Sequence, residues 1–156
     1  MTRAVLTFHS IDDSGSVLSF PARAFAMLLS CLRESGVPVL PFSRLREART
    51  GVTITFDDGM RSVAENALPV LRDLALPSHL FLTTGTVGRD NRWASQPAAI
   101  EAMSMMDWPS IEACASAGMT VECHTATHPD LRRLPPAAMP PWPRGSAPTG
   151  WSSTPG

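Results

Sequence analysis

Short apolar runs alternate with amphipathic stretches along the first part of the chain. Residues 4–11 are rich in strand-forming residues and lead into a turn-prone segment, which predicts a first strand. Across 21–35 the apolar residues recur at helical spacing until a Ser-Gly pair stops the pattern, which predicts an amphipathic helix. A short extended piece follows at 37–41, and the alternating, β-branched residues 51–56 predict a second strand.

The alternation of helices and strands continues beyond this second strand. Asn66 is placed to cap a helix that ends at Pro77, and residues 79–83 predict the next strand. Asp107 is placed to cap another helix, and residues 119–123 predict the strand after it. Strands that alternate with helices imply a largely parallel sheet, open or closed into a barrel, with ligand chemistry at the carboxyl ends of the strands.

The character of the chain changes abruptly after Leu134. Residues 135–156 contain seven of the 15 prolines, together with Gly, Ser and two Trp, and have no helical or strand periodicity. We therefore divide the chain into a partial domain at 1–134 and a tail at 135–156. We interpret the tail as the result of a truncation or a shifted reading frame, and a genuine disordered tail is the alternative.

Composition and charge narrow the class of protein. The 156 residues are 44% hydrophobic and 17% charged with a net charge of -1, which favours a globular domain and argues against nucleic acid as a partner. The three cysteines are irregularly spaced and predict neither a disulfide framework nor a thiolate zinc site. The apolar run before His9 is too short for a signal peptide or a membrane span, so we expect a cytoplasmic protein.

Two short patterns carry residues suited to metal-assisted hydrolysis. Asp57 and Asp58 precede a glycine at a strand end, where a turn lets neighbouring carboxylates surround one point. His124 and His128 are four residues apart, so one helical turn after the last strand would bring both imidazoles to one ion. Taken alone, the first pattern also suits an ordinary turn. The second, taken alone, also suits two surface histidines near a turn. Together they predict a three-ligand metal site with open positions, and the remaining aspartate becomes the candidate base.

These motifs resemble those of a known family, the polysaccharide deacetylases, also called the NodB-homology group or carbohydrate esterase family 4. Residues 55–59 resemble the first signature motif and residues 124–128 the second. The likeness extends over residues 4–134, and its flanking segments are residues 8–11, 66–71 and 108–118. The resemblance implies an α/β fold, a distorted (β/α) barrel that is incomplete here and reduced to its first four or five units.

The resemblance also implies a division of roles among the four motif residues. Asp57 is the expected catalytic base, while Asp58, His124 and His128 are the expected ligands of a divalent ion, usually zinc and sometimes cobalt, manganese or nickel. The implied reaction is hydrolysis of an N-acetyl group, or less often an O-acetyl group, from an amino-sugar glycan. His9 near the cleft is a secondary candidate, with a polar residue that merely lines the site as the alternative, and Trp93 could stack on a sugar ring, although a structural or incidental role is preferred for it.

The sequence departs from the family pattern in its later motifs. The family uses a later histidine as general acid and an Arg-x-Pro-Tyr segment at the oxyanion site, whereas this chain has no Tyr and no His after His128. We therefore expect weak or absent deacetylase activity, and a truncated pseudoenzyme that binds metal or glycan is the alternative. An unclosed sheet also leads us to expect self-association. An aspartate-nucleophile phosphatase is set aside because the D-x-D spacing is missing.

Overall fold

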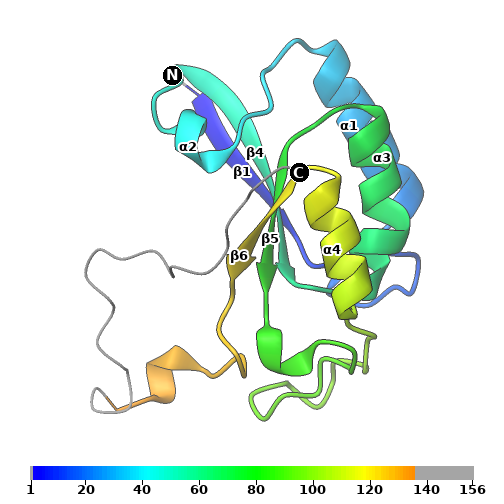
Figure 1. Ribbon diagram of the computed structural model, residues 1–156, viewed down its shortest axis with the longest axis vertical. Helices are drawn as coiled ribbons and strands as arrows, with labels where there is room; N and C mark the ends of the chain where they lie inside the picture. The colour runs from blue at the N-terminus through cyan, green and yellow to red at the C-terminus, as the bar shows by residue number, and fades with distance from the viewer. Residues whose placement is uncertain (1, 136–156) are drawn as a thin grey trace.

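A parallel sheet with helices on one face forms the centre of the protein (Figure 1). The computed structural model describes residues 2–135. The main elements are β1 (Thr2–Phe8), α1 (Ala22–Glu34), β4 (Thr50–Asp58), α3 (Leu68–Asp73), β5 (Ser78–Leu82), α4 (Trp108–Ser116) and β6 (Met119–Cys123). The shorter ones are β2 (Ser10–Ile11), β3 (Ser19–Phe20), α2 (Phe42–Leu45), the π-helical turn η1 (Val63–Ala67) and the 3₁₀ turns η2 (Thr84–Thr86) and η3 (Leu131–Arg133).

The sheet has the strand order β1-β4-β5-β6, and every neighbouring pair is parallel. All four carboxyl ends therefore lie at one edge, at the bottom of Figure 1, where the loops after β5 and β6 lie side by side. The register pairs Phe8 with Phe56 and Asp58 with Leu82, so the residues that follow the strands start from nearly the same level. This arrangement confirms the predicted α/β class and places the motif residues at one edge.

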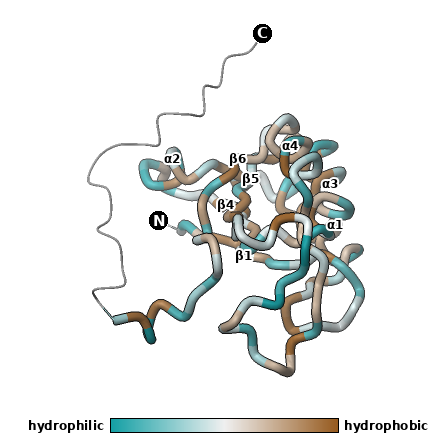
Figure 2. Tube along the Cα trace, turned by 60° about the horizontal axis from the view of Figure 1, so that its bottom comes forward, coloured by the Kyte–Doolittle hydropathy of each residue, from teal (hydrophilic) through white to brown (hydrophobic). Residues whose placement is uncertain are grey.

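Alternation along the strands separates a packed face of the sheet from a more polar one. Ile54, Phe56 and Leu80 point toward α1, α3 and α4 and are fully buried, because apolar residues of the helices cover them. Phe25 of α1 packs edge-on against Phe8 with ring centroids 5.3 Å apart. Figure 2 shows the most hydrophobic stretches gathered around the central strands. Burial of this kind stabilises the fold by about 1.5 to 3 kcal/mol for each large side chain.

Helix α2 partly covers the opposite face of the sheet and is held there by the buried His79. The Nε2 atom of His79 accepts a hydrogen bond from the Phe42 N–H at 3.1 Å, and its Nδ1 lies 3.2 Å from Oε1 of Glu122. The Nε2 acceptor fixes the hydrogen on Nδ1, so this nitrogen donates to the carboxylate. His79 therefore ties α2 to strands β5 and β6, a structural role.

The helix after β4 differs from its prediction. It begins earlier, as a π-helical turn over Val63–Ala67, and continues into α3. Asn66 does not cap it, because the Asn66 amide instead donates to the carbonyl of Ile11 at 2.7 Å. Asp107 does cap α4 as predicted, accepting from the Ser110 N–H at 3.0 Å. The two-stranded sheet of β2 and β3 was not predicted, because strands of two residues leave no period in the sequence.

Asp12 stabilises the loop between β2 and β3, and this gives the protein an acid-sensitive contact. Burial alone would raise the Asp12 pKa, but hydrogen bonds from Ser10, Ser14 and Ser19 outweigh it and lower that pKa to about 2. Since the folded pKa is depressed, the stabilisation is present above the unfolded value and is lost as pH falls through 3.8 toward 2. We expect the urea midpoint of Asp12→Asn to change less than that of wild type between pH 5 and 2, with the exposed neighbour Asp13→Asn as control. Equal pH dependence of Asp12→Asn and wild type would contradict this.

Three predictions concern features that the described residues do not test. The tail at 135–156 lies outside them except for Pro135, so the division at Leu134 stays a prediction. No helix within residues 2–135 is long and apolar enough to cross a membrane, and the cytoplasmic location stays a prediction. Self-association through the edges of the sheet also stays a prediction.

Candidate metal centre

Asp58 is the buried centre of the candidate site. It ends β4 with a left-handed backbone (φ 72°), a conformation that aspartate tolerates better than most residues. The Thr83 N–H donates to its carbonyl at 3.0 Å and so fixes this backbone to the end of β5. The residue is only 2% exposed, and its Oδ1 atom has no hydrogen-bond partner among the described residues. A buried carboxylate oxygen without a partner is costly unless a cation faces it.

Two imidazoles approach this same oxygen from the loop after β6. The Nε2 atom of His128 lies 3.3 Å from Asp58 Oδ1, and that of His124 lies 3.6 Å from it. Asp58, His124 and His128 each offer one ligand atom, and these three atoms all lie within 4.8 Å of one another. Zinc binds such atoms at about 2.0 to 2.2 Å, so ligands of one tetrahedral ion lie roughly 3.4 Å apart. The three residues therefore fit a divalent metal.

The loop that carries the histidines is not the helical turn expected from their spacing. Thr125 and His128 both have left-handed backbones, with φ 67° and 48°, and no helix spans them. The N–H groups of Thr84 and Gly85 donate to the carbonyls of Thr125 and Ala126, which ties this loop to the loop after β5. The His128 N–H donates to Thr125 Oγ1 at 3.0 Å. Backbone hydrogen bonds, rather than helical periodicity, thus bring the two imidazoles together.

Burial and neighbouring charges act in opposite directions on Asp58. Burial raises the pKa of its carboxyl group above 3.8, and the adjacent Asp57 raises it further. The three nearby histidines, when charged, lower it in part: His128 most, then His9 and His124. The net direction is upward, which means that the ionised carboxylate is held in an unfavourable environment. A bound cation would reverse that balance by favouring the charged form.

Asp57 precedes Asp58 in the chain but is not one of the three residues that could hold the metal. It stands opposite Phe81 in the sheet register, remains half-buried and is absent from the group that could hold a metal. The Gly59 N–H donates to the Asp57 backbone carbonyl at 2.9 Å.

A 470 Å³ cavity opens beside the ligands and includes the secondary candidates. Its lining contains His9 and Trp93 together with Asp58 and His128. The Trp93 ring is stacked on the His128 imidazole, with centroids 4.3 Å apart and planes 28° from parallel. Ser95 donates from its hydroxyl to the His128 carbonyl. The sequence suggested only that Trp93 could stack on a sugar ring. It gave no indication of Ser95, because both residues lie in a long loop without periodicity.

Comparison with known proteins gives this arrangement a family context. The family model described as polysaccharide deacetylase matches residues 45–141, more than half of the chain. YxkH of Bacillus subtilis (strain 168), which carries the name of a polysaccharide deacetylase, is 24% identical over 140 residues. That alignment covers 85% of this chain and 45% of YxkH.

Solved structures share the fold. IcaB from Ammonifex degensii gives a TM-score of 0.68 at 29% identity, over 87% of this chain and 57% of IcaB. The Streptococcus pyogenes deacetylase PplD, solved in complex with acetate, gives 0.67 at 20% identity, over 86% of this chain and 61% of PplD. The chain thus spans about half the length of the relatives it matches, and the expected incomplete NodB-type barrel is confirmed. With the family model matched over both motifs, the chain belongs to the polysaccharide deacetylase family.

Proposed function

We propose that this chain carries the metal centre of a glycan deacetylase, with zinc held by Asp58, His124 and His128. The observation that carries the proposal is the buried, unpartnered Asp58 Oδ1 with two imidazole nitrogens at 3.3 and 3.6 Å. Mixed nitrogen and oxygen ligands are typical of a catalytic zinc site, because three protein ligands leave a position for water. The proposed substrate is an acetylated amino-sugar glycan, and N-acetyl groups are preferred to O-acetyl groups.

Asp57 is the proposed general base. When bound, the ion would supply Lewis acidity that polarises an acetyl carbonyl and lowers the pKa of a water toward about 7. Asp57 is half-buried and adjacent in the chain to the proposed ligand Asp58, which supports its carboxylate as the acceptor of a proton from that water. The cavity lined by His9 and Trp93 would hold the sugar while the bond to the acetyl group breaks.

We propose further that the 156-residue chain is a weak enzyme or inactive. The leaving amine must be protonated, and no histidine follows His128 to serve as the acid. Of the four histidines, His124 and His128 are assigned to the metal, His79 is committed to α2 and Glu122, and His9 precedes the motifs and lines the cavity. Losing a general acid costs about 10² to 10⁴ in rate, and losing an oxyanion donor about 10² to 10³. A pseudoenzyme that retains metal and glycan is the second candidate.

Zinc content and acetate release, measured on one preparation, test the proposal. We expect one zinc per chain in wild type, the same in Asp57→Asn, and almost none in His124→Ala, because His124 is a proposed ligand and Asp57 is not. With acetylated chito-oligosaccharide as substrate, we expect slow acetate release that disappears in both variants. Zinc would be measured by elemental analysis after dialysis, and acetate by an enzyme-coupled assay.

Each outcome of this experiment has a distinct meaning. Zinc with slow acetate release that depends on Asp57 supports a deacetylase. Zinc without detectable acetate supports the pseudoenzyme. A wild-type chain that folds and binds no zinc would overturn the proposed metal centre, and robust turnover by residues 1–156 would overturn the expectation of weak activity.

A further inference from the structure

We propose that the pocket next to the metal centre binds an anionic group of the glycan, so that the preferred substrate is an acidic amino-sugar polymer. The inference rests on the proposed function, since it concerns the glycan presented to that centre. It adds the requirement that the glycan carry negative charge, which the metal ligands and the proposed base do not impose. The anionic group is a sugar carboxylate or a phosphate ester, because arginine recognises both through the same fork of N–H donors.

The pocket is larger than the cavity at the ligands and shares lining residues with it. It has a volume of about 830 Å³ and lies between the loop after β5 and the loop after β6. Six residues line both spaces: Trp93, Ser95, Pro97, Pro129, Asp130 and Arg132. A glycan with one sugar at the metal centre would therefore extend its neighbouring sugars into this pocket.

The lining of the pocket is strongly basic. It contains four arginines and one carboxylate, although the whole chain has 13 basic and 14 acidic residues. The basic residues are Arg89, Arg92, Arg132 and Arg133. A cluster of one sign in a chain of nearly zero net charge creates a local field that favours an anion.

Ion pairs inside the pocket leave part of this charge uncompensated. Arg132 holds Asp130 through two hydrogen bonds of 3.0 Å, and Arg133 lies 3.4 Å from the same carboxylate. One carboxylate therefore faces two guanidinium groups. Arg92 is paired with Asp90, but no carboxylate of the described residues lies within 4.0 Å of an Arg89 nitrogen. Arg89 and Arg133 are the cations available to a ligand.

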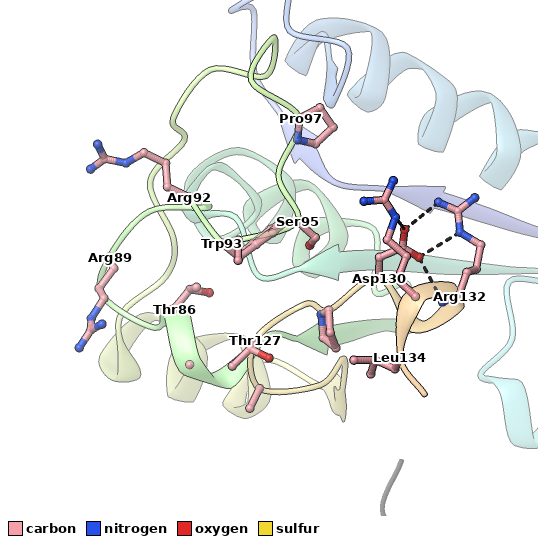
Figure 3. Close-up of a pocket in the computed structure, with 15 residues that line it drawn as sticks. Thr86, Arg89, Arg92, Trp93, Ser95, Pro97, Thr127, Asp130, Arg132 and Leu134 are labelled. Atoms are coloured by element: carbon pink, nitrogen blue, oxygen red, sulfur yellow. Dashed lines mark hydrogen bonds and ion pairs between the residues drawn. The ribbon is translucent and has the colours of Figure 1, made fainter. Parts of the chain in front are cut away.

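The charges are arranged along the pocket with an aromatic residue between them. In Figure 3, Arg89 and Arg92 project from the rim at one end, Asp130 and Arg132 lie at the other, and Trp93 and Ser95 lie between the two ends. Trp93 and the alanine and proline residues of the lining supply apolar surface for a sugar ring, and the hydroxyl groups supply hydrogen bonds. A glycan that carries negative groups at intervals suits this arrangement, in which an aromatic surface lies between two sets of arginines.

Isothermal titration of the zinc-loaded 156-residue chain with three hexasaccharides tests the inference. The probes are neutral chitohexaose, a hexasaccharide in which N-acetylglucosamine alternates with glucuronic acid, and chitohexaose phosphorylated at the 6-hydroxyls. We expect at least one anionic probe to bind about tenfold more tightly than chitohexaose at low salt, and high salt to remove the difference. The double variant Arg89→Gln/Arg133→Gln should lose the preference. Arg72→Gln, which removes an exposed arginine at the end of α3, should keep it.

The outcomes separate this inference from the proposed function. Preference for the uronic acid probe alone identifies a carboxylate, preference for the phosphorylated probe alone identifies a phosphate ester, and both results support the anion site. Equal affinity for all three probes would overturn it, as would a preference that survives in Arg89→Gln/Arg133→Gln. If zinc is bound and chitohexaose releases acetate without any anionic preference, only this inference fails. If the preference is found but zinc is not bound, only the proposed metal centre fails.

Discussion

Replacing Asp58 with Asn is expected to weaken zinc binding by about 100-fold while making the metal-free protein slightly more stable. The variant removes the charged ligand but keeps the shape of the side chain, and Asn tolerates the left-handed backbone at this position (φ 72°). Burial raises the pKa of Asp58, so stability is lost as pH rises from the unfolded value of 3.8 toward the folded pKa, and the full cost remains at higher pH. The comparison is made at pH 8, far above the unfolded pKa of a carboxyl group. We expect Asp58→Asn to gain about 1 kcal/mol there.

Thermal melts at pH 8 with and without zinc test both halves of this prediction. Zinc should raise the melting temperature of wild type, because a ligand that binds only the folded state stabilises it, and should raise that of Asp58→Asn much less at the same concentration. Asp57→Asn is the matched control, since it removes the adjacent carboxylate without removing a proposed ligand. A metal-free Asp58→Asn that is clearly less stable than wild type would contradict the view that this charge is retained for metal binding.

The larger elements could be predicted from the sequence because their burial is periodic. Strand β4 and helix α1 each bury one regular set of apolar residues, and α4 carries a recognisable Asp107 cap. The elements that were missed or misplaced lack such a pattern. Helix α2 has only four residues and is positioned by contacts to His79, which is distant in sequence. Long-range contacts of this kind leave no local periodicity to detect.

The sequence predicted which residues form the candidate site but not the backbone structure that brings them together. Two strand ends and an H-x-x-x-H pair identified Asp58, His124 and His128, and parallel strands bring their carboxyl ends together. The helical turn expected between the histidines was wrong, because hydrogen bonds from Thr84 and Gly85 hold that loop, with its left-handed residues, against the neighbouring one. The basic pocket was also missed, since its arginines come from two loops separated in sequence.

The Gly85→Ala variant is expected to damage the metal centre without removing any polar group. A Cβ atom at this position would lie 2.3 Å from the backbone carbonyl oxygen of Ala126, which is too close for any side chain to relieve by rotating. The Gly85 N–H also donates to that oxygen at 2.8 Å, so the two loops would have to separate. Because Ala126 lies between His124 and His128, separation moves the ligands relative to Asp58. We expect a loss of about 2 kcal/mol in the free energy of unfolding and about 10- to 100-fold in zinc affinity.

Gly88→Ala in the same loop is the control that distinguishes displacement of the ligands from general damage. Its backbone is left-handed (φ 72°) and nothing lies within 4 Å of the added Cβ, so only backbone strain of about 1 kcal/mol is expected. Urea unfolding and zinc titration against a competing chelator would be measured for both variants. If Gly88→Ala keeps wild-type zinc affinity and Gly85→Ala does not, the contact between the two loops positions the histidines. If Gly85→Ala binds zinc as wild type does, the loop after β5 is not what holds His124 and His128 against Asp58, and the site must be organised by β6 alone.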